Sequence, residues 1–264
     1  IVFHVVGVAF IEVVLVDDGS ADDTWKIIAD YASCSRMRLL CLSQKHAGAA
    51  AARNLGMEDC NAPYLMFLDA DDVYHPDMIR SLYTCIQSGC DTAFCYTSRD
   101  VDALLCDFHF VSSNRFRHLE IDDAMKIFMY QKEHIHFTGF LYRRTILTDY
   151  SLSFRCGVRY GEDLEFVWKY LARCRNACLI DKALYGYSDH PASAVHQIHW
   201  SKTDLADAML RTGQYLKKYH SSFAPSFSSY MLPRSMWTVA KTFAMGRERT
   251  MYQLFCQRYH LRRY

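Results

Sequence analysis

Several features that mark specialised chains are scarce in this sequence. Only 11 glycines and 5 prolines occur among 264 residues, which excludes collagen-like and low-complexity chains. Charge of one sign is not in excess, because the formal net charge is +1, and this argues against a dedicated nucleic-acid binder. With 51% hydrophobic and 14% aromatic residues, the chain has the composition of a folded protein with a substantial core. Its length predicts one large domain, or one domain with an extension.

Long apolar runs are also missing. The stretch 1–16 is interrupted by His4 and Glu12 and is shorter than the roughly 20 residues of a membrane-spanning helix. It lacks the basic leader and the small-residue cleavage site of a signal peptide. We therefore expect a soluble, cytoplasmic protein, at most peripherally bound to the inner face of the cytoplasmic membrane. The basic residues that would form a lipid-facing surface, or else an ordinary solvated helical face, are Arg247, Arg249, Arg258, Arg262 and Arg263.

Paired cysteine motifs are absent as well. Eleven cysteines are scattered along the chain without a C-x-x-C pair. An odd number at irregular spacing predicts reduced thiols packed as small apolar side chains. We expect no structural zinc site, because the tightest histidine pair, His134 and His136, has no cysteine at ligand spacing.

Strand-like and helix-like segments alternate through the first 190 residues. Strands are predicted at 11–18, 38–44, 64–71 and 92–97, and helices around 25–32, at 47–57 and from Pro76 onward. This order predicts an α/β fold with a mostly parallel sheet and helices on both faces. From Thr203 onward the pattern is helical only.

One predicted strand, at residues 2–6, does not fit a parallel arrangement. Only about four residues separate it from the next strand, whereas a parallel crossover needs a dozen or more. Either the two strands form a hairpin, or the sequence lacks a segment after Val6, and we favour the second. A similar gap is conceivable within 101–114, which shows no periodicity.

Acidic residues cluster at the end of the buried strand predicted at 64–71. Asp69, Asp71 and Asp72 would repel one another there unless a cation or another partner relieved the repulsion. Ligands of open α/β sheets bind at the carboxyl ends of strands, and carboxylates bind hard cations such as Mg²⁺ that hold a diphosphate. The alternative is a solvated turn that caps the next helix.

Three further motifs suggest the same site. Asp17 and Asp18 end the buried strand predicted at 11–18, where they would accept hydrogen bonds from a nucleobase or a ribose, or else cap the next helix. Arg53 lies in an alanine-rich helix and suits a diphosphate or a structural pair with an acid. Glu162 and Asp163 follow Gly161 at the start of a helix, where acids also interact favourably with the helix dipole.

Together these motifs resemble the family 2 glycosyltransferases, which have the GT-A fold. The matching segments are VDDGS at 16–20, AARNLG at 51–56, FLDADD at 67–72 and GED at 161–163, and the resemblance spans roughly 11–193. The Pro-x-Tyr/Phe-Asn-like turn that usually follows the first strand of such enzymes is absent. The resemblance implies a catalytic domain at 1–200, with a nucleotide-sugar part at about 1–100 and an acceptor part at about 101–200, and a helical extension at 201–264.

The resemblance also implies an activity, of the type that builds bacterial cell-surface polysaccharides. A sugar would pass, with inversion, from a nucleotide-diphosphate donor, by the same resemblance a UDP-sugar, to a hydroxyl of a saccharide or lipid-linked acceptor. Asp18 resembles the acid that contacts the base, with Asp17 beside it, and Arg53 resembles the arginine near the diphosphate. Asp69 and Asp71 match the DxD motif, which holds the ribose and a divalent cation, Mn²⁺ or Mg²⁺.

The acceptor side of the site is implied in the same way. Asp163 resembles the catalytic base, and Glu162 would help to place the acceptor. A carboxylate within about 3 Å of the acceptor hydroxyl takes its proton during a single in-line displacement. His190 would reach the metal or the phosphates from a loop, or else it is a surface histidine.

Two other functions remain open at this point. FLDADDV also fits the opening motif of haloacid-dehalogenase-like phosphatases, in which Asp69 would be the nucleophile. A catalytically inactive module that binds nucleotide sugars would carry the same fold. A dinucleotide oxidoreductase is disfavoured, because no G-x-G-x-x-G follows a predicted strand.

Overall fold

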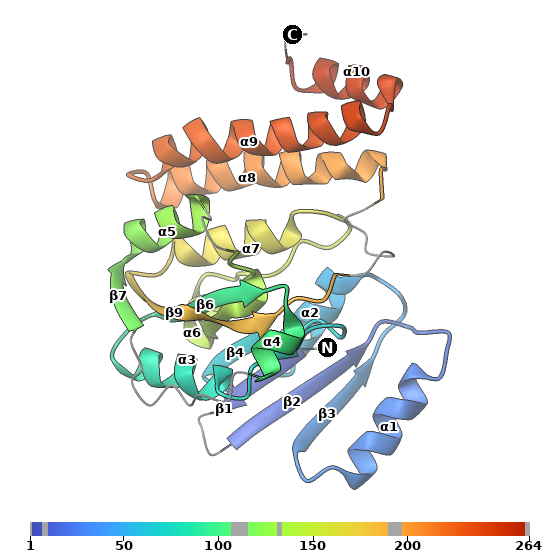
Figure 1. Cartoon of the computed structure of the whole chain (residues 1–264), viewed down its shortest axis with the longest axis vertical. Helices are drawn as coiled ribbons and strands as arrows, with labels where there is room; N and C mark the ends of the chain where they lie inside the picture. Colours follow the sequence, from blue (N-terminus) through green and yellow to red (C-terminus); the bar gives the residue numbers. More distant parts are fainter. Residues whose placement is uncertain (1, 7–9, 107–115, 131–133, 190–196, 262–264) are drawn as a thin grey trace. The chain divides into compact units, whose positions relative to one another are not determined.

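The computed structural model describes residues 2–6, 10–106, 116–130, 134–189 and 197–261 (Figure 1). These residues belong to two compact units. The sheet unit comprises Ile1–Gly157 and Arg173–Asp189, and the helical unit comprises Val158–Ala172 and His190–Tyr264. The expected domain boundary at residue 200 stays a prediction.

The sheet unit is built on a single mixed sheet. Its strands are β1 (Val2–Val6), β2 (Phe10–Asp17), β3 (Arg38–Ser43), β4 (Tyr64–Phe67), β5 (Val73–Tyr74), β6 (Thr92–Ser98), β7 (Phe116–Glu120), β8 (Phe140–Arg143) and β9 (Asn176–Gly186). They are ordered β3-β2-β1-β4-β8-β6-β9-β5, and β7 also pairs with β9. Among the described pairs, β2–β3 and β6–β9 are parallel, and the others are antiparallel. The expectation of a mostly parallel sheet is therefore wrong, although the four predicted strands are all present.

The strand at 2–6 accounts for part of this difference. β1 forms a hairpin with β2, in which Val2 faces Val14, and its other edge pairs antiparallel with β4. A connection of a few residues is long enough to join antiparallel neighbours. The hairpin therefore needs no additional segment after Val6, and the interpretation that we favoured is wrong. Within 101–114, residues 101–106 form a helix, and residues 107–114 lie outside the described part.

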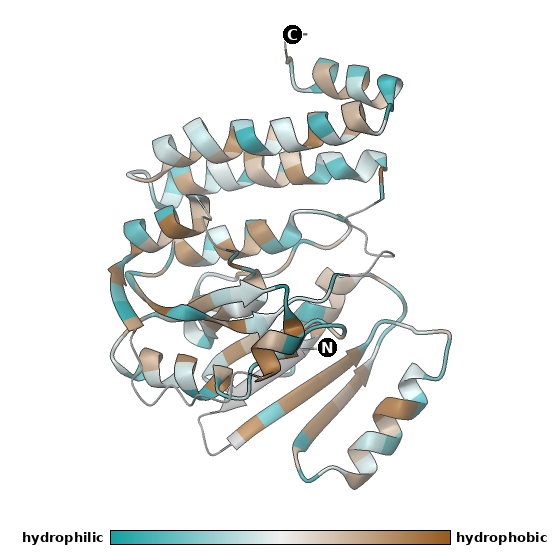
Figure 2. Cartoon of the chain, in the orientation of Figure 1, coloured by the Kyte–Doolittle hydropathy of each residue, from teal (hydrophilic) through white to brown (hydrophobic). Residues whose placement is uncertain are grey.

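Six α-helices accompany the sheet in the described ranges. They are α1 (Thr24–Cys34), α2 (Ala49–Glu58), α3 (Met78–Gln87), α4 (Val101–Cys106), α5 (Ile121–Tyr130) and α6 (Arg144–Asp149). The sequence predicts α1, α2 and α3, and it does not predict α4, α5 and α6. Apolar residues dominate β2 and β3, as Figure 2 shows. The core between α3 and the sheet includes Met66, Leu82, Ile86, Leu141 and Tyr185. Burial of these side chains holds strand β4 in place, and with it the acidic turn that follows the strand.

The helical unit consists of four α-helices in its described part: α7 (Glu162–Leu171), α8 (Thr203–Tyr219), α9 (Ala224–Met245) and α10 (Arg249–Arg258). The helices predicted beyond Thr203 are thus confirmed. Phe243 and Phe255 join α9 and α10 in one apolar cluster, and Trp168 of α7 packs on Phe227 of α9. No helix in the described ranges is both long and apolar enough to cross a membrane.

The cysteines depart from expectation at one place. Cys90 and Cys178 form a disulfide, whereas the other nine cysteines are free thiols. The expectation that all eleven are reduced is therefore wrong for this pair. A sequence separation of 88 residues hides such a pairing from any local pattern.

Candidate functional site

The loop after β2 is closely packed against the loop that leads into α2. Gly19 has φ +72°, and a Cβ at this position would lie 2.7 Å from the backbone nitrogen of His46. Asp17 is buried, and its Oδ1 accepts a hydrogen bond from the Ser20 amide at 3.3 Å. Only glycine therefore fits the turn that presents the two aspartates.

Asp18 serves as an anchor between these loops. Its Oδ1 accepts hydrogen bonds from the Gln44 amide side chain at 2.7 Å and from the Ala47 backbone at 2.8 Å, and its Oδ2 accepts from the Gly48 backbone at 2.8 Å. His46 pairs with Oδ2 at 2.8 Å. Burial raises the pKa of Asp18, but these hydrogen bonds and the charge of His46 outweigh burial and leave it below its ordinary value. The carboxylate thus caps the start of α2 rather than its own following helix.

The acids after β4 lie on a turn, because the strand ends at Phe67 and not at Asp71 as predicted. The Asp72 amide donates to the Asp69 carbonyl at 3.1 Å and closes this turn. Arg53 of α2 donates from Nη2 to Asp69 Oδ1 at 2.8 Å. Helix α2 and strand β4 therefore bring together two residues that the sequence assigned to one site.

Arg53 is held firmly in this position. The residue is 8% exposed, and its guanidinium lies 4.5 Å from the centre of the Phe137 ring and 5.4 Å from that of Phe154. Burial raises the pKa of Asp69, but the Arg53 charge and hydrogen bond, with a contribution from His136, hold it below its ordinary value. Asp69 is therefore kept ionised by a cation of the protein itself.

The other two acids of the turn differ sharply in environment. Asp72 is buried and accepts hydrogen bonds from the Tyr185 hydroxyl and, at 2.8 Å, from the Ser188 amide. Burial raises the pKa of Asp72, and the charges of Asp69 and Asp71 raise it further against the opposing effect of those hydrogen bonds. Asp71 is exposed, and no hydrogen bond or ion pair links it to another described residue. Asp71 is thus the acid of this turn that is available to a ligand.

Aromatic side chains that were assigned no role in the site from the sequence lie beside the acids. His136 stacks on Tyr185 with ring centres 5.8 Å apart and lies at the same distance from Tyr187. Its Nδ1 lies 2.7 Å from the hydroxyl of Thr138. Tyr142, by contrast, is a core residue whose hydroxyl donates to the Phe137 carbonyl. The pairing of Asp72 with Tyr185 spans 113 residues, and no local pattern signals it.

The donor set after β4 suits a divalent cation that shares its ligands with a substrate. Mg²⁺ binds through one or two carboxylates together with phosphate oxygens and water. Asp71 is exposed and Asp69 lies in the same turn, so the turn offers that number of carboxylates. The turn does not form a closed metal cage. Within the described ranges, the only group of three His, Cys, Asp or Glu residues whose ligand atoms lie within 4.8 Å of one another is Cys90, His118 and Cys178, away from this turn.

The remaining predicted site residues lie in the helical unit. Gly161 has φ +83° and precedes α7, and a Cβ there would lie 3.0 Å from the Cβ of Ala208 in α8. This close approach fixes the first turn of α7, where Asp163 is partly buried and accepts a hydrogen bond from the Leu164 amide at 2.7 Å. Glu162 is also partly buried. The predicted metal ligand His190 lies outside the described residues.

Glu165, which the sequence did not single out, is the acid of α7 with a structural role. It is 2% exposed and pairs with Lys169 at 2.6 Å and with Arg211 of α8 at 2.6 Å. Burial raises its pKa, but these two cations outweigh burial and hold it below its ordinary value. Glu165 thus pairs with one cation of α7 and one cation of α8.

Comparisons with known proteins agree with the motifs. The family model described as glycosyl transferase family 2 matches residues 8–151. The chain is 26% identical over 229 residues to the uncharacterized glycosyltransferase YibD of Escherichia coli, covering 83% of this chain and 65% of YibD. It is 27% identical over 196 residues to the uncharacterized glycosyltransferase EpsJ of Bacillus subtilis, covering 69% of this chain and 54% of EpsJ. The chain therefore spans less than two thirds of the length of either relative.

A solved structure shows the same fold. S. aureus TarS 1–349 in complex with UDP-GlcNAc superposes with a TM-score of 0.63 at 17% identity, over 88% of this chain and 62% of TarS 1–349. The mixed sheet with flanking helices thus has the GT-A fold that the motifs implied, and helices follow it at the carboxyl end as expected.

Proposed function

Because the chain belongs to glycosyl transferase family 2, we propose that it transfers a sugar from a nucleotide-diphosphate donor to a hydroxyl of a saccharide or lipid-linked acceptor. UDP is the proposed nucleotide, supported by the structures of TarS with UDP-GlcNAc and with UDP. Membership of this family argues against the alternative of a phosphatase in which Asp69 is the nucleophile. The pairing of Asp69 with Arg53 also speaks against that role.

The arrangement of charges after β4 is the observation that carries the proposal. Two of the three acids are already engaged, Asp69 by Arg53 and Asp72 by Tyr185 and Ser188. Asp71 remains exposed beside them. An acid that has no partner among the described residues and raises the pKa of Asp72 is unfavourable for stability alone, which supports a ligand-binding role.

A divalent cation, Mn²⁺ or Mg²⁺, is proposed to be held by Asp71 and Asp69 together with the donor phosphates. When bound, it neutralises the charge that develops on the leaving diphosphate. Arg53, fixed between Phe137 and Phe154, holds Asp69 in place and adds positive charge near the diphosphate. His190 stays a proposed additional ligand.

The loops after β2 and β3 are proposed to hold the base and the ribose. Asp17 and Asp18 follow β2, and the hydrogen bonds from Gln44, Ala47 and Gly48 keep the Asp18 carboxylate rigid. A nucleobase N–H that takes the place of the exposed His46 on Oδ2 meets an acceptor that is already ordered and ionised.

Asp163 is proposed as the base that takes the proton of the acceptor hydroxyl, with Glu162 positioning the acceptor. Two features support this assignment: Gly161 fixes the first turn of α7, and Glu165 pairs with both Lys169 and Arg211. One base acting opposite the leaving group gives a single displacement, so the anomeric configuration of the donor sugar inverts.

The proposed location is the cytoplasm, with peripheral contact to anionic lipid. Exposed free thiols at Cys34, Cys106 and Cys156 support a reducing compartment. Arg247 and Arg249 are exposed near the exposed Met245, which suits a lipid surface, whereas Arg258 is engaged by Asp207 at 2.7 Å. Sedimentation with phosphatidylglycerol vesicles but not with phosphatidylcholine vesicles, lost at high salt, would support this contact. Equal sedimentation with both would contradict it.

The transfer itself is tested by incubating the chain with a panel of UDP-sugars and Mn²⁺ and measuring the release of UDP, with and without oligosaccharide acceptors. Asp163→Asn should lower kcat by about 10²–10⁴-fold with donor affinity unchanged. A wild-type chain that binds a UDP-sugar but releases no UDP under any condition would identify an inactive binding module instead. A product that retains the donor's anomeric configuration would contradict the single displacement.

A further inference from the structure

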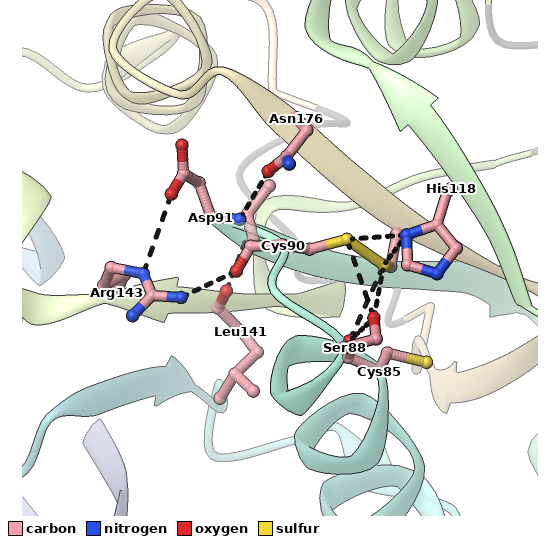
Figure 3. Close-up of a disulfide and its surroundings, with 10 residues drawn as sticks. Cys85, Ser88, Cys90, Asp91, His118, Leu141, Arg143 and Asn176 are labelled. Atoms are coloured by element: carbon pink, nitrogen blue, oxygen red, sulfur yellow. Dashed lines mark hydrogen bonds and ion pairs between the residues drawn. A yellow bond between two sulfur atoms is a disulfide. The ribbon is translucent and has the colours of Figure 1, made fainter.

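A second cluster of chemically active side chains lies apart from the acids, on strands β7 and β9 and in the loop that precedes β6 (Figure 3). His118 of β7 is the cross-strand partner of Cys178 in β9, and Cys90 lies two residues before Thr92, which pairs with Ala177. His118 Nδ1 lies 3.3 Å from the sulfur of Cys90 and 3.5 Å from that of Cys178. Strand register therefore brings the three side chains together.

The surroundings of the two sulfurs suit a form other than the disulfide. Cys178 Sγ lies 3.5 Å from the hydroxyl oxygen of Ser88 and 3.6 Å from the carbonyl oxygen of Cys85. The Ser88 hydroxyl donates to that same carbonyl, so it turns lone pairs toward the sulfurs. Disulfide sulfur carries no proton to meet these acceptors, whereas a reduced Cys178 thiol donates to the Cys85 carbonyl, and the Ser88 hydroxyl can turn to donate to a thiolate.

The distances also match a known coordination geometry. Zinc binds cysteine sulfur at about 2.3 Å and histidine nitrogen at about 2.0–2.1 Å, so a tetrahedral zinc holds its N and S ligand atoms about 3.6 Å apart. The two Nδ1–Sγ distances, 3.3 and 3.5 Å, are close to this value. Two sulfurs on one zinc are about 3.8 Å apart, which requires the disulfide to be reduced first.

From this geometry we infer that Cys90, Cys178 and His118 form a zinc site in the reduced protein. Two molecules of a thiol reductant supply two electrons, become one disulfide and leave Cys90 and Cys178 as thiols. Zinc then displaces one proton from each thiol and binds both thiolates and neutral His118 Nδ1, with water in the fourth position. The charges of the ion and the two thiolates cancel, so the site is neutral where both cysteines are fully buried.

The backbone around the cluster is ordered in advance. The Arg143 guanidinium donates to the Cys90 carbonyl at 2.7 Å, and the Asp91 amide donates to the Asn176 side chain at 2.9 Å. The Arg175 amide donates to Asp91 at 2.8 Å, which joins the chain segments before β6 and β9. Exposed free thiols elsewhere in the chain are consistent with the reducing conditions that the site needs.

The test uses the whole chain, reduced with a phosphine under anaerobic conditions, incubated with Zn²⁺ and desalted. We expect one zinc per chain by elemental analysis, none in the oxidised chain, and thiolate-to-metal charge-transfer absorption when Co²⁺ replaces zinc. His118→Ala alters an exposed side chain and should weaken zinc binding by at least about 100-fold, because even outer partners of a zinc site contribute 10–100-fold. Cys90→Ser should abolish the charge-transfer band.

Matched controls separate this site from the acids after β4. Cys34→Ser removes an exposed free thiol and should keep the zinc, and so should Asp71→Asn, whatever the outcome for the proposed glycosyl transfer. Reduced wild-type chain without bound zinc would overturn the inference. So would a His118→Ala variant with unchanged zinc affinity, or a zinc content that is lost with Asp71→Asn and kept with Cys90→Ser.

Discussion

Arg53 and Asp69 form the partly buried ion pair on which the geometry of the β4 turn depends, and Arg53→Met tests it. The change keeps the alkyl stem but removes the guanidinium that lies 2.8 Å from Asp69 and 4.5 Å from the Phe137 ring centre. Removing one partner of a buried pair costs about 3–5 kcal/mol. The side chain of Asp69 keeps 31% of its surface exposed, so we take about 2 kcal/mol for the pair, discounted for solvent screening. Loss of the cation–π contact adds about 1 kcal/mol.

The pH dependence has a defined sign. In the wild-type chain the pKa of Asp69 is below its unfolded value of about 3.9, so its stabilising contribution is complete above that pH and is lost as the pH falls through the folded pKa. Without Arg53, burial raises the pKa of Asp69 and disfavours the carboxylate at neutral pH. The deficit of the variant should therefore be greatest at pH 7 and smaller at pH 4.

Thermal unfolding of wild type, Arg53→Met, Asp69→Asn and the double variant measures the coupling. A loss of about 3 kcal/mol corresponds to a fall in Tm of roughly 6–12 °C for a unit of this size. Lys126→Met, which removes an exposed ion pair with Asp123 on α5, should leave Tm unchanged and serves as the control. A Tm of Arg53→Met equal to that of wild type, or a deficit that does not shrink toward pH 4, would refute the reasoning.

Two further variants test the first turn of α7. Gly161→Ala should destabilise the helical unit by about 2–4 kcal/mol, because it combines a φ of +83° with a Cβ 3.0 Å from the Cβ of Ala208. Gly157→Ala is the control for the backbone effect alone: it has a φ of +77° with open space around it and should cost only about 1 kcal/mol. Equal urea midpoints for the two variants would show that packing against α8 is unimportant. Glu165→Gln should lower the free energy of unfolding by about 3 kcal/mol, because Lys169 and Arg211 lose a buried counter-charge. Asp163→Asn, by contrast, should unfold at the wild-type temperature. The reverse order of stability would make Asp163 the structural acid of the helix.

Local patterns were sufficient for the elements that carry strong periodicity. The apolar runs of β2, β3, β4 and β6 and the helices between them lie where the sequence predicts. The acids after β4 and the glycine before α7 also lie at element ends, as predicted. These features depend on residues that are near one another in the chain, so propensity and spacing reveal them.

Contacts between distant segments could not be predicted in this way. Strand β1 pairs antiparallel with both β2 and β4, which contributes to the mixed sheet. Which strands become neighbours depends on contacts across the whole sheet and not on the sequence of one strand. Asp18 binds donors about 30 residues away, Asp72 binds Tyr185 113 residues away, and Cys90 joins Cys178 88 residues away. A sequence identifies such residues as candidates, but only the fold assigns their partners.

Calorimetric titration of UDP into the chain, with and without Mn²⁺, tests the central claim most directly: the exposed acid after β4 binds a nucleotide diphosphate through a divalent cation. We predict that UDP binds at least tenfold more tightly with Mn²⁺, and that Asp71→Asn loses this dependence while Asp123→Asn, on the exposed face of α5, keeps it. Metal-dependent UDP binding that persists unchanged in Asp71→Asn would contradict the account.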